Sequence, residues 1–518
     1  MSPAADTPPQ RQVPGFLNNV LWNWFGVSIN LVSGLLLTPI IVKRLGVDNY
    51  GLWVVVTSLV DYYWLLDLGM RSAIVRYSAH YSTTRDFGKF NEVICTSLAY
   101  NLVLSPVLLA ASWWAMPHVG SLLHQEHPLI PKLFMVVAGA WAITSLLSTF
   151  TSTLEGLQRY DIVNQTAFVM TALRAAVTLA LLLAGYGVLE LAYVTVGGQI
   201  LLHGVNFFRL RRVMPHLKLS PAFAHLKVLT MMLRYGVHSV MSSLALRLIG
   251  YSPPLLIGHF LPLSSVAYYT SPLRLLDYTV EAVARIGNVS NARAAHLWAA
   301  GRQQELARFS VTVNRYSLAL FLPLILFLIF YGQAFFAWWI DADFARQCAG
   351  VLMALLVGQT LGNAAQYSSN SILFGIGRHQ MYARGMLVEA VLAVAGLWFL
   401  LPLYGITTAA AFCSALMVLN RGLFVPWQLA RELKISWLGF LANVNRPLLA
   451  GIPVAAVLWP LRQTILPGAG LWQLLLAGAI TVLVYAPFAY WTIPAEDREP
   501  ILYRLRGYLG RIYAIPAK

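Results

Sequence analysis

Residues 154–163 read LEGLQRYDIV, and residues 373–382 read LFGIGRHQMY. Aligned with Leu154 opposite Leu373, the two stretches place Gly156 opposite Gly375 and keep an arginine three positions later in both. A similar stretch that recurs far along the chain is typical of a repeated structural unit. We therefore predict that the chain contains an internal duplication.

Two further matches follow in the same chain order. Under a shift only one position shorter, Tyr50 and Gly69 correspond to Tyr268 and Gly287, with the same separation between the two residues in each copy. The openings of the first and seventh apolar segments, FGVS and YGVH, also agree if a small insertion is allowed. Chance could produce one such match, but three in the same order favour a duplication.

Composition places both copies in a membrane. The chain has 518 residues, of which 58% are hydrophobic and 11% charged, and its mean hydropathy is +0.65. A soluble protein carries about a quarter charged residues, whereas apolar runs of about 20 residues can each cross a bilayer. We predict an all-α polytopic membrane protein with about fourteen spans, at 17–42, 50–76, 92–115, 132–154, 162–185, 188–208, 230–251, 264–288, 310–332, 348–372, 383–402, 405–427, 447–464 and 471–491.

The repeat encloses six spans, so both copies insert in the same orientation. This arrangement predicts two pseudo-symmetric six-helix bundles that rock about a central cavity, as in several carriers. The alternation of arginines and large apolar residues near the C-terminus predicts a segment on the membrane surface. The expected parts are a cytosolic lead at 1–16, an N-lobe at 17–208, a cytosolic linker at 209–229, a C-lobe at 230–427, two extra spans at 428–491 and a basic tail at 492–518.

Charge predicts the orientation. The formal net charge is +16, and the loops carry 23 Lys and Arg on the N-terminal side of the predicted spans against 5 on the other side. Such residues stay in the cytosol, so we expect both termini there. Insertion thus explains most of the charge, and we expect no nucleic-acid partner. The polar lead lacks the apolar run of a signal peptide, and the three cysteines, at unrelated spacings, indicate neither disulfide nor metal site.

Eight arginines remain within the spans or near their ends. An arginine at mid-membrane costs roughly 2.5–3.5 kcal/mol on insertion scales. We expect Arg234 and Arg421, near span ends, to extend to the interface, while the deeper ones require a partner or a water-filled cavity. The eight are Arg71, Arg174, Arg234, Arg247, Arg274, Arg285, Arg315 and Arg421.

Polar side chains in five spans follow helical spacing, so each set shares one face. Hydrogen bonding between helices is one explanation of the Ser, Asn and Gln stripes, and acid–arginine pairs at i,i+4 could serve packing alone. We favour a wet cavity between the lobes, which explains all the stripes together. The stripes include Asn23 and Asn30 in the first span, Tyr63, Asp67 and Arg71 in the second, Ser145 and Glu155 in the fourth, Arg274, Asp277, Glu281, Arg285 and Asn288 in the eighth, and Asn363 and Gln366 in the tenth.

Two glycines occupy equivalent places among these charged groups. Gly69 lies between Asp67 and Arg71, and its repeat mate Gly287 follows Arg285. Because glycine permits backbone conformations that other residues avoid, each could allow a bend in its span. We predict that both act as hinges.

Several stretches resemble the polysaccharide-transport branch of the multidrug/oligosaccharidyl-lipid/polysaccharide flippase superfamily, which includes the O-antigen and exopolysaccharide repeat-unit flippases. The resemblance implies a V-shaped pair of six-helix bundles in the bacterial inner membrane. It also implies a substrate, a polyprenyl-pyrophosphate-linked oligosaccharide turned from the cytosolic to the periplasmic leaflet. The similar stretches are GLLLTPIIVKRLGVDNYGLW at 34–53, DLGMRSAIVRYSAHY at 67–81, LEGLQRYD at 154–161 and PLLIGHFLPLSSVAYYTSPLRLL at 254–276.

Two departures from the family pattern matter. Members often carry an acid just before the segment that matches PLLIGHF, where this chain has Ser252 and Pro253, so no role of that acid can be transferred. The lipid II flippase branch bears a charged cluster in its first span, whereas NNVLWNWFGVSINLVSGLLL has none. This absence argues against a peptidoglycan precursor as the cargo.

A pyrophosphate and a sugar chain must cross about 30 Å of hydrocarbon. Arginine suits this task, because its planar guanidinium binds phosphate oxygens in pairs. We expect no cofactor, and we expect membrane lipids and a polysaccharide polymerase machinery as further partners. The hypothesis assigns the head group to Arg71, Arg247, Arg274 and Arg285, charge balance or coupling to a proton or sodium ion to Asp67, Asp277 and Glu281, and sugar contacts to Asn23, Asn30, Tyr63, Asn288, Asn363 and Gln366.

Three alternatives compete with a flippase. An ion-coupled drug or cation antiporter of the same fold would favour an acid-dominated cavity, whereas these spans hold more arginines than acids. A membrane polymerase or ligase generally needs a sizeable outer loop, and the longest one here, about 116–131, is short. A scaffold role is the third. We expect transport rather than an enzymatic activity.

Overall fold

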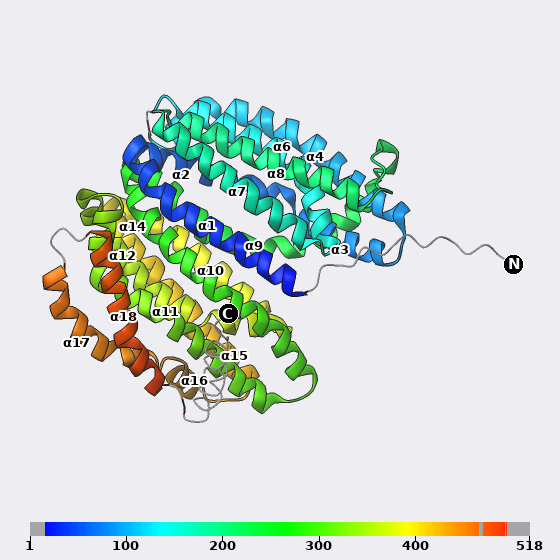
Figure 1. The fold of residues 1–518 in the computed structure, drawn as a ribbon. Helices are drawn as coiled ribbons and strands as arrows, with labels where there is room; N and C mark the ends of the chain where they lie inside the picture. Colours follow the sequence, from blue (N-terminus) through cyan, green and yellow to red (C-terminus); the bar gives the residue numbers. More distant parts are fainter. Residues whose placement is uncertain (1–15, 126, 466–469, 493, 495–518) are drawn as a thin grey trace, which may run out of the picture. The chain divides into compact units, whose positions relative to one another are not determined.

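The computed structural model describes residues 16–125, 127–465, 470–492 and 494, with the side chains of 16–27, 237–242, 282–289 and 464–465 left aside. The described residues form helices and no strand, as the composition predicts. Their contacts divide the chain into two compact units, Met1–Ala267 and Tyr268–Lys518. Figure 1 shows the helices of both units.

Unit 1 is a bundle of long helices with one short insert. The second predicted span is built from three pieces, α2, η1 and α3, and the others each correspond to one long helix. The elements are α1 Phe16–Leu45, α2 Val47–Asp61, η1 Tyr62–Asp67, α3 Met70–Thr83, α4 Phe87–Ala115, η2 Met116–His118, α5 Val119–Leu122, α6 Ile130–Gly156, α7 Tyr160–Leu183, α8 Val188–Val213, η3 Pro221–Phe223 and α9 Leu226–Phe260.

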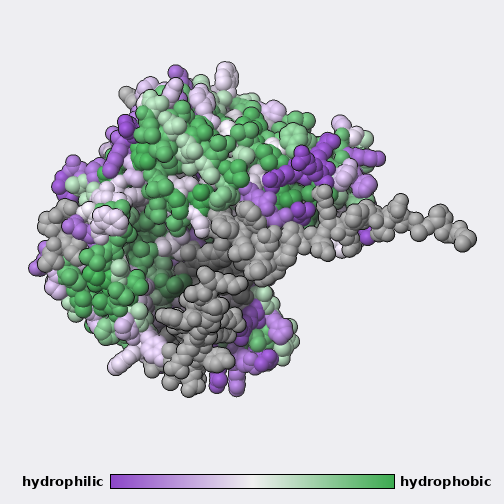
Figure 2. All heavy atoms as spheres, viewed as in Figure 1, coloured by the Kyte–Doolittle hydropathy of each residue, from purple (hydrophilic) through white to green (hydrophobic). Residues whose placement is uncertain are grey.

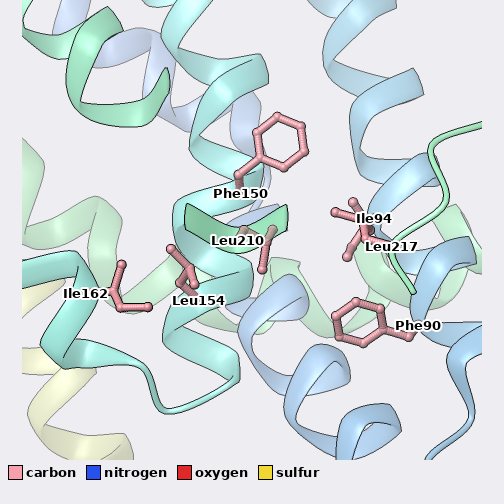
Figure 3. Packing of buried hydrophobic residues seen from close by; sticks show 7 residues of the cluster. All are labelled: Phe90, Ile94, Phe150, Leu154, Ile162, Leu210 and Leu217. Carbon is pink, nitrogen blue, oxygen red and sulfur yellow. The ribbon is translucent and has the colours of Figure 1, made fainter. Parts of the chain in front are cut away.

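A buried apolar cluster joins four helices of unit 1 at one end. Phe90 and Ile94 of α4 meet Phe150 and Leu154 of α6. Figure 3 shows them together with Leu217, which lies in the loop after α8. Ile162 of α7 and Leu210 of α8 complete it. Burying a large apolar side chain stabilises the fold by about 1.5–3 kcal/mol, so the cluster anchors the polar turn after α6.

A second cluster attaches α9 to unit 1. Met70 and Ile74 of α3 pack with Val93 of α4 and with Met232 of α9, and all four are buried. The contacts therefore group α9, the seventh predicted span, with the first six. The repeat instead predicts a boundary between the two lobes at residues 209–229, and this boundary stays a prediction.

Unit 2 contains long helices interrupted by two π-helical segments, η4 and η5. Gly405 (φ 71°) breaks the run that contains α14, which separates the eleventh and twelfth predicted spans. The elements are α10 Leu263–Ala299, which begins just before the unit boundary, α11 Gln303–Trp339, α12 Ala342–Gly358, η4 Gln359–Ala364, α13 Tyr367–Gly375, α14 Gln380–Met417, η5 Val418–Phe424, α15 Val425–Glu432, α16 Trp437–Val444, α17 Leu448–Ile465 and α18 Leu471–Thr492.

The turn that follows α6 has the same form as the turn that follows α13, as the predicted duplication requires, although the same form also ends α7 and α15. In both turns three successive backbone N–H groups donate to carbonyl oxygens four, three and five residues earlier. The middle residue is left-handed in each, Gln158 with φ 58° and Gly377 with φ 71°, and the alignment of the two stretches places these positions opposite each other. Gly156 touches α3, and its mate Gly375 touches α10, the helix that repeats α3.

The helices agree with a multi-pass membrane protein. Among the described residues ten helical stretches are long and apolar enough to span a bilayer, or eleven with the bent α2–α3 pair. Each of the fourteen predicted ranges falls largely on helical segments, and the count itself stays a prediction. Apolar side chains such as Leu102, Val103 and Trp114 are largely exposed. Figure 2 shows such side chains over much of the visible surface, as expected of helices that face lipid.

Candidate functional site

A bend places the charged groups of the second span. The axis turns by 47° between α2–η1 and α3, where Leu68 (φ 46°) and Gly69 (φ 75°) are both left-handed. A Cβ at Gly69 would lie 2.3 Å from the carbonyl oxygen of Gly236 in α9, so backbone packs directly on backbone there. The structure thus puts Gly69 at a bend, and its motion as a hinge stays a prediction. α10 continues as a helix through Gly287.

The bend sets Asp67, the last residue of η1, just before the start of α3. Its Oδ2 accepts a hydrogen bond from the Arg71 backbone N–H at 3.2 Å. A carboxylate is favoured at a helix N-terminus, where backbone N–H groups lack partners in the helix. The i,i+4 spacing that suggested a self-neutralising pair therefore brings Asp67 to the Arg71 backbone rather than to its guanidinium.

The Arg71 guanidinium pairs instead with the fourth span. Its Nη2 donates to Oε1 of Glu155 in α6 at 2.7 Å. α6 approaches α3 closely because Gly156 has no side chain, and a Cβ there would lie 2.7 Å from the Val75 carbonyl oxygen. The Arg71 side chain is 62% exposed and that of Glu155 15%. The pair thus orients a guanidinium while most of its surface remains available to a ligand.

Arg247 joins the same neighbourhood from α9. Its guanidinium lies 4.4 Å from the centre of the Trp64 ring, and its Nη1 donates to the Asp61 carbonyl oxygen at 3.3 Å. The charges of Arg247 and Arg71 both act on the Asp67 carboxylate. The structure therefore brings together three predicted residues, Asp67, Arg71 and Arg247, within unit 1.

Other residues predicted to line a cavity have different surroundings. The Tyr63 hydroxyl lies 2.6 Å from Ser112 Oγ of α4, and its ring contacts Trp141 edge-on. Asn30 is exposed on α1. Contact with sugars stays a prediction for both. The side chains of Asn23, Arg285 and Asn288 lie outside the described residues.

The serine stripe of the fourth span binds helices to each other. Ser145 Oγ lies 3.2 Å from Ser105 Oγ of α4, and Asn101 Nδ2 donates to the Ser145 carbonyl oxygen. Further along α6, Thr151 Oγ1 lies 2.8 Å from Nδ1 of His203 in α8. This last contact has no signature in the sequence, because a lone histidine in an apolar helix carries no periodic signal.

In unit 2, α10 carries the corresponding charges. Arg274 and Glu281 are exposed, and Asp277 between them is half-buried. The Asp277 carboxylate is subject to the charges of Arg274, Glu281 and Arg421. The described charged residues of this stripe are thus close enough to influence one another's charge. Their part in ion coupling stays a prediction.

Arg421 corrects an expectation. Its side chain does not extend to the interface but is buried and donates to both oxygens of Glu389, through Nε at 3.2 Å and Nη2 at 2.9 Å. Its Nη1 donates to Oδ1 of Asn363, and Asn420 also donates to Glu389. The π-helical turn of η5 directs Arg421 inward, and such turns are frequent at functional sites.

The two predicted polar residues of the tenth span belong to this buried region. Asn363 Nδ2 donates to Gln359 Oε1 at 2.6 Å, and Gln366 Oε1 accepts from Ser369 at 3.1 Å. Asn363 is 8% exposed and Gln366 1%. The structure supports a packing role for both, and their contact with sugars stays a prediction.

Long apolar helices in both units, with arginines and acids placed on them, define a multi-pass membrane protein. Residues 16–289, more than half of the chain, match the family described as polysaccharide biosynthesis protein. The chain belongs to this family, which confirms the resemblance noted in the sequence. A proposed O-antigen transporter of Shigella flexneri is 20% identical over 426 residues, which are 80% of this chain and 98% of that protein.

Two solved structures have the same fold. The lipid II flippase MurJ in an inward closed conformation matches with a TM-score of 0.71 and 13% identity, over 91% of this chain and 98% of that one. An inward-facing multidrug resistance transporter of the MATE family, from the MOP superfamily, matches with a TM-score of 0.60 and 15% identity, over 80% and 95%. At these identities the two likenesses establish the fold.

Proposed function

We propose that this protein is a flippase that moves a polyprenyl-pyrophosphate-linked oligosaccharide from the cytosolic to the periplasmic leaflet, for the synthesis of a cell-surface polysaccharide. The Arg71–Glu155 pair carries the proposal, because it holds a largely exposed guanidinium within a membrane-spanning helix. Membership of the polysaccharide biosynthesis family and the name of the Shigella relative support it. The substrate moves and no bond in it changes, so the proposal includes no enzymatic step and no cofactor.

The head group would bind to arginine. Arg71 and Arg247 lie in one electrostatic neighbourhood in unit 1, and Arg274 is exposed in unit 2. Guanidinium–phosphate hydrogen bonds contribute about 1.5–3 kcal/mol each. We assign the pyrophosphate to these three arginines and to Arg285, with the polyprenyl chain left in lipid and the sugars against the polar stripes.

Transport would proceed by alternating access, driven by the difference in substrate affinity between two conformations. Asp67 balances the arginines of unit 1 in the absence of substrate. Asp67, Asp277 and Glu281 are the candidates to bind a proton or a sodium ion. The Lys and Arg distribution supports cytosolic termini in a bacterial inner membrane, where a polymerase of the same polysaccharide would receive the product.

A transport assay tests the proposal. The purified chain is placed in vesicles that contain a fluorescent lipid-linked oligosaccharide, and a membrane-impermeant quencher reports the fraction that has crossed. We expect crossing with the unmodified chain and a rate about tenfold lower for Arg71→Ala, because one charged hydrogen bond to the head group is lost. No crossing above empty vesicles, or crossing of unglycosylated phospholipids at an equal rate, would refute the proposed function.

Arg302→Ala is the matched control for that experiment. Arg302 is also an exposed arginine with a carboxylate partner, Glu305, at 2.5 Å. It lies between α10 and α11 and belongs to none of the polar stripes. The rate should be unchanged in this variant, and a fall equal to that of Arg71→Ala would show a non-specific charge effect.

A further inference from the structure

A second basic feature lies on the α9 side of α3, away from the Arg71–Glu155 pair. It is a cavity with a volume of about 710 Å³. Sites for small ligands are typically of this size. The lining belongs entirely to unit 1 and comes from these two helices. The lining residues are Tyr77 of α3 and Lys227, Thr230, Met231, Arg234 and Tyr235 of α9.

The spacing on α9 explains why these side chains face one space. Positions 227, 230, 231, 234 and 235 follow the 3–4 periodicity of one helix face. Met232 is fully buried and packs against Met70 and Ile74 of α3. The apolar contact thus fixes α9 on α3. The α9 face that carries Lys227 and Arg234 lies next to this contact.

An aromatic wall borders the cavity. The Tyr77 and Tyr235 rings meet edge-on, with their centres 6.1 Å apart, and Tyr77 also stacks on Tyr81. The Arg76 guanidinium lies 4.4 Å from the centre of the Tyr235 ring. This contact keeps a third cation near the cavity, since cation–π contacts hold a guanidinium over an aromatic face.

The lining therefore combines cations and aromatic rings, and none of its residues is acidic. Lys227, Thr230 and Arg234 are exposed. Lysine, arginine and hydroxyl groups are the usual donors to phosphate oxygens. Tyrosine presents a flat apolar ring with a polar tip, which suits the faces and hydroxyls of a sugar.

We propose that this cavity is a loading site, at which the diphosphate and the first sugar of the lipid-linked substrate bind before translocation. The inference rests on the proposed function and adds to it a site distinct from the head-group arginines of the polar stripes. Lys227 and Arg234 bind the diphosphate, and Tyr77 and Tyr235 contact the sugar. The Lys and Arg bias that supports a cytosolic start of α9 places the site on the side from which the substrate enters.

Phosphate could also come from a membrane lipid, because basic pockets at the cytosolic ends of spans bind anionic head groups. The test therefore uses the purified full-length chain in detergent and three probes: farnesyl diphosphate, farnesol and cardiolipin. Binding is followed by calorimetry. We expect farnesyl diphosphate to bind, farnesol to bind poorly and cardiolipin to compete weakly. Equal competition by cardiolipin would overturn the proposal in favour of a general lipid site.

Variants locate the binding. Lys227→Ala combined with Arg234→Ala should raise the dissociation constant for farnesyl diphosphate at least about tenfold, because two charged contacts are lost. The charge-retaining Lys227→Arg with Arg234→Lys should keep most of the affinity, which separates charge from folding. Arg212→Ala with Lys218→Ala removes two cations from the adjacent linker and should have no effect.

The two proposals fail in different ways. Suppose that Arg71→Ala slows crossing in vesicles, while the double variant of Lys227 and Arg234 binds farnesyl diphosphate and transports normally. The proposal of a loading site is then wrong, and the proposed flippase function is retained. If the chain binds farnesyl diphosphate through Lys227 and Arg234 but moves no lipid-linked oligosaccharide, the proposed flippase function is wrong. The cavity would then be a diphosphate-binding site without a role in transport.

Discussion

Arg71 and Glu155 are far apart in the sequence, and their Nη2 and Oε1 atoms lie 2.7 Å apart in the structure. The pair joins two stretches that the sequence singles out, DLGMR at 67–71 and LEGLQR at 154–159. Its two partners differ in exposure, since Arg71 is mostly open and Glu155 is mostly covered. Glu155 therefore works as a fixed support that orients a cation toward a ligand.

The first prediction concerns this support. Glu155→Gln keeps the shape of the side chain and removes its charge, so Arg71 should lose its orientation while its own charge remains. We expect slower transport of lipid-linked oligosaccharide and only a small change in melting temperature, because the arginine of the pair is open to solvent and surface ion pairs contribute about 0–1 kcal/mol. Vesicle crossing and thermal unfolding measure the two effects.

Arg71→Lys distinguishes the need for a guanidinium from the need for a positive charge. A lysine keeps the charge but cannot offer two parallel hydrogen bonds, so the transport rate should lie between those of the unmodified chain and Arg71→Ala. A variant series in which transport follows melting temperature, rather than the guanidinium, would show that the pair acts only through stability.

The second prediction tests the repeated turn. A Cβ at Gly156 would lie 2.7 Å from the Val75 carbonyl oxygen, and one at Gly375 would lie 2.5 Å from that of Asn291. Both Gly→Ala variants should therefore lower the free energy of unfolding by about 1–3 kcal/mol, the usual cost of overpacking. The measurement is unfolding by heat or denaturant in detergent.

Gly139 and Gly197 provide matched controls for these two glycines. Both lie in helices, and a Cβ at either would meet no atom within 4 Å. Alanine there should be neutral or stabilise by up to about 1 kcal/mol, through the entropy of the unfolded chain. Equal losses at all four positions would contradict the close-packing argument.

The sequence comparison that predicts the duplication aligns two turns that each contain a left-handed residue. Gln158 and Gly377 share that backbone conformation, and the hydrogen bonds around them are the same. The spacing of charged residues along one helix is a poorer guide to their hydrogen-bond partners. It paired Asp67 with Arg71 on one helix face, whereas the guanidinium binds an acid from another helix, and contacts between helices are not contained in the spacing along one of them.

The buried pair of unit 2 could not be predicted for a related reason. Glu389 stands alone in an apolar stretch, so it belongs to no polar stripe. Arg421 lies near a predicted span end, which suggested exposure. The π-helical segment η5 shifts the helix register there, and periodicity arguments assume regular α-helical turns.

The third prediction separates this pair from the transport site. Glu389→Ala should lower stability by about 3–5 kcal/mol, because it leaves the buried Arg421 without its carboxylate. The double variant Glu389→Leu with Arg421→Met removes both charges and should recover most of that loss. Thermal unfolding of the single and double variants gives the comparison. A double variant as unstable as the single one would mean that the pair itself, rather than an unpaired charge, accounts for the effect.

The fourth prediction concerns Gly69. Its left-handed backbone costs a residue with a side chain about 1–2 kcal/mol, and a Cβ would also lie 2.3 Å from the Gly236 carbonyl oxygen. Gly377 has a similar φ of 71°, but a Cβ there would meet no atom within 4 Å. Gly377→Ala thus measures the conformational cost alone. Gly69→Ala should exceed it in unfolding measurements and should also slow transport, since α3 and α9 must separate to admit the methyl group. Equal stability losses in the two variants would show that α3 and α9 are not in backbone contact at this point, and the bend would then owe its geometry to φ alone.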